Sequence, residues 1–141
     1  MEDKLKSKAR EIMATSVSTN SPGKLFGKLF QLRDLAHLRH LKPTAPGQLG
    51  SGWEHKALND LYEETLDIVD GIIESYQGYK GLVDIEIPSS KPIDIIPHLE
   101  ELAKEIAASY NTMFPETWMQ NQLDSIQELI YTTLYKLKNL K

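Results

Sequence analysis

The chain of 141 residues contains no cysteine. Disulfide bonds, thiolate catalysis and zinc sites with cysteine ligands are therefore excluded, and any metal ion has to be held by histidine, aspartate and glutamate. No apolar run approaches the ~20 residues that span a bilayer, and no signal-peptide pattern opens the sequence. We therefore expect a cytoplasmic protein.

Several catalytic motifs are also missing. The sequence has no glycine-rich phosphate loop, no G-x-S-x-G turn, no H-E-x-x-H zinc helix and no E-x-x-H motif of the kind found in di-iron bundles. The net charge of −4 and the isoelectric point near 5.6 argue against nucleic-acid binding by the surface as a whole. A chain of this length, 40% hydrophobic and 26% charged, is expected to form one globular domain.

The strongest pattern in the chain lies between Ser51 and Gln77, with Gly50 and Gly78 just outside. Apolar residues recur there with the 3.6-residue period of an amphipathic helix, so the pattern predicts a helix over residues 51–77. The residues of its apolar face are Trp53, Ala57, Leu58, Leu61, Tyr62, Thr65, Ile68, Val69, Ile72, Ile73 and Tyr76.

A line of polar residues follows one edge of that apolar face. Its members are His55, Asn59, Glu63, Asp70 and Glu74. From residue 55 to residue 70 a helix rises roughly 22 Å at ~1.5 Å per residue, so one ion cannot touch both ends. Two copies packed antiparallel, crossing near Glu64 and Thr65, would bring His55 of one copy beside Asp70 and Glu74 of the other. This geometry favours a homodimer, and the alternative is a solvent-exposed rim.

Three further helices are predicted around this one. Ser21 and Pro22 open a helix that runs to residue 42, a third covers residues 92–111 with Asp94 as its cap, and a fourth begins at Pro115. The connection over residues 43–51 makes a hairpin of the first two helices, which should bring His40 near His55.

Residues 79–91 alternate in polarity around residues 82–87, and no partner strand is apparent. We read this segment as an extended crossover between the second and third helices. The sequence thus predicts an all-α, up-down four-helix bundle over residues 22–141 with one crossover. Residues 1–21 form a basic N-terminal arm or a short helix.

The first predicted helix carries polar residues on its apolar face. Arg33, His37 and His40 share that face, where polar groups need partners. One interpretation pairs Arg33 with Asp70 or Glu74 across the core and lets the histidines donate to backbone carbonyls. The other makes His40, and to a lesser extent His37, a metal ligand.

Two more residues carry expectations. His98, near the start of the third helix, is expected to be exposed to solvent. Gly71 interrupts the second helix at a cost of ~1 kcal/mol relative to alanine, and close packing of another helix against it would account for its presence.

The pattern His40, His55-x3-Asn59, Asp70-x3-Glu74 resembles the ferritin-like family of DNA-binding proteins from starved cells, Dps. That resemblance implies a ferritin-like bundle and iron held between subunits by His40, His55, Asp70 and Glu74. Asn59 stands where the family has a ligating aspartate, so the site is partly degenerate. The sequence around His40 and His55 is also similar to that of small phage-encoded ferritin-like proteins of unassigned role, and this resemblance implies a phage-related origin.

Three hypotheses follow. The first is a homodimer or larger shell that oxidises ferrous iron, and the second is a non-catalytic assembly protein that binds a host protein or sequesters a small ligand. In the second, Arg33 neutralises the leftover carboxylates. The third is DNA binding through the basic arm, whose cationic residues are Lys4, Lys6, Lys8 and Arg10.

Overall fold

The computed structural model of the protein describes residues 21–41 and 52–140. This part of the chain forms four α-helices and no strand: α2 (Pro22–Leu41), α3 (Gly52–Lys80), α4 (Ile95–Thr112) and α5 (Thr117–Asn139). The prediction of an all-α chain with four helices is confirmed. The basic arm and the loop after residue 41 lie outside the described residues.

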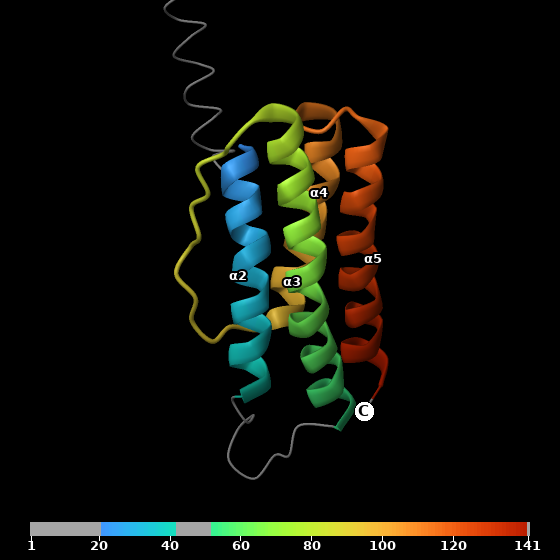
Figure 1. Ribbon diagram of the computed structural model, residues 1–141. Helices are drawn as coiled ribbons and strands as arrows, with labels where there is room; N and C mark the ends of the chain where they lie inside the picture. The colour runs from blue at the N-terminus through green and yellow to red at the C-terminus, as the bar shows by residue number, and fades with distance from the viewer. Residues whose placement is uncertain (1–20, 42–51, 141) are drawn as a thin grey trace, which may run out of the picture.

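The four helices lie side by side with their axes roughly aligned (Figure 1). α2 runs from the upper end of the bundle to the lower end, and α3 returns to the upper end. α4 also runs upward, parallel to α3, and α5 runs downward. α2 packs mainly on α3, α3 on α5 and α5 on α4, so each helix is antiparallel to the neighbours that it contacts.

The core is formed by leucine, isoleucine and three large aromatic side chains. Phe26 from α2 is fully buried and lies edge-on to Tyr76 of α3, with ring centroids 5.3 Å apart. Its other face stacks on Phe114, which follows α4, at 5.9 Å. These contacts join three segments that are distant in sequence, so the aromatic cluster fixes how α2, α3 and the α4–α5 turn meet.

The segment Gly81–Asp94 crosses the bundle along the outer side of α2 (Figure 1). Its backbone lies so close to α2 that a methyl group at Gly23 would overlap the carbonyl oxygen of Asp84, and one at Gly27 would overlap that of Glu86. Gln31 completes the contact by donating a hydrogen bond to the carbonyl of Ser89 over 2.9 Å. Two glycines one turn apart therefore let an extended backbone lie directly on a helix.

The helix ends largely follow the sequence signals. The Ser21 hydroxyl accepts from the amide of Lys24, and the Asp94 carboxylate accepts from the amide of Ile96, each over 3.3 Å. Both predicted caps are confirmed. α5 begins two residues after Pro115, with Glu116 at its cap position.

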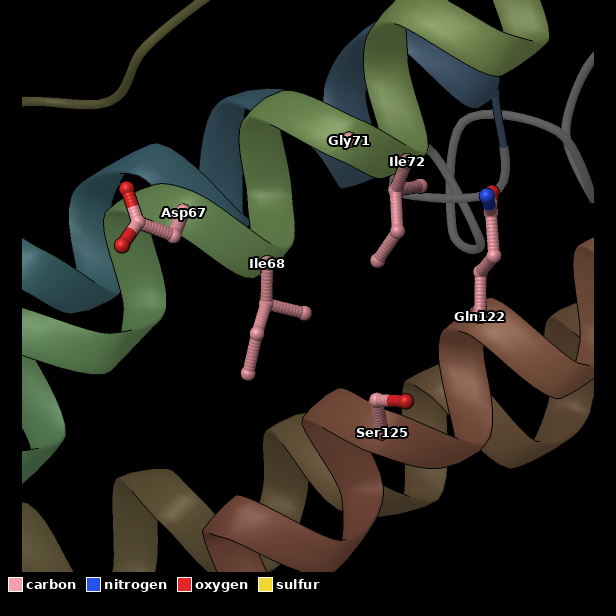
Figure 2. Close-up of a pocket in the computed structure, with 6 residues that line it drawn as sticks. All are labelled: Asp67, Ile68, Gly71, Ile72, Gln122 and Ser125. Carbon is pink, nitrogen blue, oxygen red and sulfur yellow. The ribbon is translucent and has the colours of Figure 1, made fainter.

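Two expectations about packing are wrong. Trp53, predicted on the apolar face of its helix, is 48% exposed, because it lies in the first turn of α3. Gly71 does not mark a close helix contact: a methyl group there would meet nothing within 4 Å, and the glycine lines an open hollow between α3 and α5 (Figure 2).

Within the described ranges no helix is long and apolar enough to cross a membrane.

Candidate functional site

The predicted histidine ligands meet where α2 ends and α3 begins. The ring centroids of His40 and His55 are 3.9 Å apart, so the expectation that the hairpin brings them together is confirmed. The Nδ1 of His40 donates a hydrogen bond to the carbonyl of His55 over 3.1 Å. A carbonyl can only accept, so Nδ1 carries the proton and the lone pair of a neutral His40 lies on Nε2.

Tyr62 lies about two helical turns after His55 on α3, and its ring contacts both His37 and His40. Its ring stacks on His37 with centroids 4.5 Å apart and lies edge-on to His40 at 5.4 Å. Its hydroxyl donates to Oδ1 of Asn59 over 2.8 Å. The sequence pattern predicts Tyr62 only as part of the apolar face. Its position three residues after Asn59 also places the two side chains on the same side of the helix, which would have indicated this hydrogen bond.

This hydrogen bond gives Asn59 a role within the chain. Its side-chain oxygen, the atom that would replace a carboxylate as a ligand, already accepts from Tyr62. An amide oxygen also carries no charge to balance a cation. The structure therefore places Asn59 beside the histidines as a partner of Tyr62.

An ion pair joins the two helices at the same end. Arg39 of α2 lies 3.0 Å from Glu54 of α3, and both side chains are more than two-thirds buried. Because this pair links residues flanking His40 and His55, it restricts how far the two imidazoles can separate.

The predicted carboxylate ligands lie elsewhere on α3. Asp70 and Glu74 are both exposed, and the rise from residue 55 to residue 70 is roughly 22 Å. In residues 21–41 and 52–140 no three histidine or acidic side chains are close enough to hold a metal ion together. One copy of the chain therefore brings together the imidazoles but not the complete predicted ligand set.

Comparison with known proteins places the chain in a family. The family of unknown function DUF5856 matches residues 53–137, which is more than half of the sequence. The chain belongs to this family. No curated protein and no solved structure matches it. The matched region of this DUF5856 member includes His55, Asn59, Asp70 and Glu74, whereas α2 with His40 lies outside.

Two residues predicted on the buried face of α2 are in fact exposed in this DUF5856 chain. Arg33 and His37 both face solvent, and Arg33 makes no ion pair with the described residues. The pairing of Arg33 with Asp70 or Glu74 across the core is therefore wrong. His40 is half-buried. The buried face of α2 is therefore narrower than predicted.

The expectation that His98 is exposed is also wrong. His98 is half-buried on α4, and its Nε2 is buried without a hydrogen-bond partner among the described residues. Burial lowers the pKa of His98, and the Lys28 ammonium lowers it further, with partial compensation from Glu105. Lys28 and Glu105 form an ion pair at 2.8 Å between α2 and α4. The surroundings of the imidazole therefore favour its neutral form beside a charged pair.

The four cationic residues proposed for DNA contact, at positions 4, 6, 8 and 10, lie outside the described residues.

Proposed function

We propose that this DUF5856 protein is a ferritin-like subunit whose copies pair through α3 and hold iron between them. The observation that carries the proposal is the division of ligands along one helix: His55 lies near one end with His40 against it, and Asp70 and Glu74 lie towards the other. The course of Gly81–Asp94 supports a ferritin-like bundle, because it allows α3 and α4 to run in the same direction.

Two copies related by a two-fold axis would complete the ligand set twice. In an antiparallel pair, His40 and His55 of each copy approach Asp70 and Glu74 of the other. Thr65 is buried inside its own chain, so the crossing involves Glu64 and the neighbouring exposed Glu63 instead. Lys56 is also exposed and would face the partner's acidic half, which adds charge complementarity.

The donor set suits iron. Imidazole nitrogens together with carboxylate oxygens form a mixed set that binds ferrous iron, and the two carboxylates balance its charge. Iron would be the substrate of this site: two ferrous ions would each give one electron to one hydrogen peroxide, which takes up two protons and becomes two waters, while both irons become ferric. Since Asn59 supplies no charge, we expect weaker binding than a site with a third carboxylate would give.

The first experiment combines mass and metal content. Size exclusion with light scattering gives the oligomeric state, and elemental analysis of the same peak gives bound iron. The double variant Asp70→Asn/Glu74→Gln should keep the oligomer and lose iron. The matched control Glu101→Gln/Glu128→Gln removes the same charge from exposed positions on α4 and α5, away from the proposed crossing, and should keep the iron. Equal iron in both variants would refute the site.

A mixing experiment tests whether the site lies between subunits. A His40→Ala/His55→Ala chain and an Asp70→Asn/Glu74→Gln chain should each bind no iron alone. Refolded together as dimers, they should recover about one quarter of the wild-type iron, because half of the dimers are mixed and each mixed dimer has one intact site. A site within one chain predicts no recovery.

A second candidate is an assembly protein without metal chemistry, which binds a host protein or sequesters a small ligand. The hydrogen bond from Tyr62 to Asn59 favours this candidate, because the side-chain oxygen of Asn59 then stabilises the fold and does not serve as a metal ligand. Under this proposal ferrous iron leaves the midpoint of thermal unfolding unchanged, whereas a bound ion raises it. DNA binding through the basic arm is a separate prediction. An unchanged DNA affinity after deletion of residues 1–20 would refute it.

A further inference from the structure

The connection Gly81–Asp94 has one backbone edge on α2 and a second edge on its outer side. The carbonyl oxygens of Asp84 and Glu86 point at α2, where they lie against its two glycines. After its first residue the connection runs without a turn or bend. Successive carbonyls of an extended chain point in opposite directions, so the backbone groups of Ile85 and Ile87 point away from α2. Figure 1 shows the connection on the outside of the bundle.

The backbone groups on this outer edge have few partners. The amide of Val83 donates to the side chain of Gln77 over 3.1 Å. The amides of Ile85 and Ile87 make no hydrogen bond with the described residues. An extended edge with unpaired amides and carbonyls is a template for a further strand.

The side chains of the connection form two rows. Val83 and Ile85 are half-buried against the core. Asp84 and Glu86 are exposed, and neither carboxylate is in an ion pair with the described residues. A strand added to the outer edge therefore meets an acidic row on its solvent side. A second copy of the connection fits badly, because antiparallel pairing about Ile85 places Asp84 of each copy opposite Glu86 of the other.

The beginning of the chain carries the complementary pattern. Four cations are spaced there two residues apart: Lys4, Lys6, Lys8 and Arg10. The residues between them are apolar or small: Leu5, Ser7 and Ala9. In an extended strand this spacing puts all four cations on one face.

The position of α2 brings this segment within reach of the connection. α2 begins at Pro22, one residue before Gly23, which lies against the carbonyl of Asp84. The ten residues 11–20 link the cationic segment to that point. Ten residues span at most about 33–36 Å, which is enough for the segment to lie anywhere along the acidic row.

We propose that residues 4–10 bind along the outer edge of the connection as an antiparallel strand. The connection descends from the start of α2, so a segment that leads into that start has to rise beside it (Figure 1). Ser7 pairs with Ile85 through two backbone hydrogen bonds. Two cations then lie opposite the two carboxylates: Lys8 opposite Asp84, and Lys6 opposite Glu86. The added strand covers an edge that could otherwise pair with other proteins, and it does not depend on the proposed iron site.

The absence of native cysteine allows a register-specific test in the full-length protein. Lys8→Cys/Asp84→Cys should form a disulfide within one chain in a glutathione buffer, because the Cα atoms of directly opposite residues lie about 4.5–5.5 Å apart. The control Ser7→Cys/Asp84→Cys moves the first thiol to the other face of the strand and should react at least about tenfold more slowly.

Mass spectrometry of the unreduced protein separates the outcomes of this test. A faster disulfide in Lys8→Cys/Asp84→Cys, at the mass of one chain, supports the proposal. Equal rates in the two variants would show random encounters and overturn it. A covalent dimer would show that the segment binds a second copy, which overturns pairing within one chain.

Charge reversal tests the pairing without cysteine. Asp84→Lys should raise the rate at which the amide of Ile85 exchanges with deuterium by about three- to fivefold, because like charges opposite each other weaken the strand pair. Adding Lys8→Glu to the same chain should restore the slower rate. Glu101→Lys makes the same charge change at an exposed position on α4 and should leave the rate unchanged. No effect of Asp84→Lys, or no recovery in the double variant, would overturn the proposal.

Discussion

Replacement of Gly27 by alanine tests how firmly the segment Gly81–Asp94 is held on α2. A methyl group at residue 27 would overlap the carbonyl oxygen of Glu86, which is backbone and cannot rotate away. Either the helix or the connection has to move, and forced overpacking of this kind costs about 1–3 kcal/mol. Detachment would also expose Val83 and Ile85, which pack against the core, for about 1 kcal/mol more each.

Alanine also has a favourable effect at this position. It is a better helix former than glycine by about 1 kcal/mol, so the net change for Gly27→Ala, with the connection detached, should be a loss of about 2–4 kcal/mol. Gly71→Ala is the matched control, because the same change in an open part of α3 should stabilise the protein by about 0.5–1 kcal/mol. The two variants should therefore shift stability in opposite directions.

Urea unfolding followed by circular dichroism measures both changes. The midpoints should move apart while the slope with denaturant stays constant, since a similar surface is exposed on unfolding. Gly23→Ala, which overlaps the carbonyl of Asp84, should behave as Gly27→Ala does. If Gly27→Ala equals or exceeds the wild type in stability, the close contact between the connection and α2 does not exist as described.

Three other substitutions have calculable outcomes. His98 has a lowered pKa in the folded state, from burial first and the Lys28 ammonium second, so the unfolded chain takes up the proton first as the pH falls below about 6.5. Wild-type stability should therefore fall between pH 7 and pH 5 more steeply than that of His98→Leu, and equal slopes in urea titrations at each pH would contradict this. Phe26→Ala should cost about 3–5 kcal/mol, because the side chain is fully buried between two aromatic rings, and a loss below 1 kcal/mol in calorimetry would contradict the packing. Asp94→Ala removes the cap of α4 and should cost about 0.5–1 kcal/mol in urea unfolding, whereas Asp94→Asn should retain most of that stability.

Much of the fold could be predicted because its determinants are local. The period of apolar residues in α3 and the caps Ser21 and Asp94 act within one or two helical turns, and the structure contains all of them. The same reasoning brought His40 and His55 together, since a hairpin joins the ends of consecutive helices.

The failures concern contacts between distant segments. Nothing near Gly27 in the sequence signals that a backbone 59 positions later, at Glu86, will lie on it (86 − 27). His98 resembles a surface residue in its own helix, and its partial burial and the nearby Lys28 of α2 depend on tertiary packing. Periodicity also identifies the buried face of a helix but not the limits of that face, so it does not show that Arg33 and His37 lie outside it.

The placement of the connection on α2 has a consequence for how the native state opens. α2 and residues 81–94 are separated in sequence by the whole of α3, yet they share contacts from Gly23 to Gln31. α2 cannot leave the bundle without releasing the connection, so the two segments should form one cooperative unit in native-state hydrogen exchange. The amide of Val83, which donates to the side chain of Gln77, should then exchange with the same opening free energy as the amides in the middle of α2.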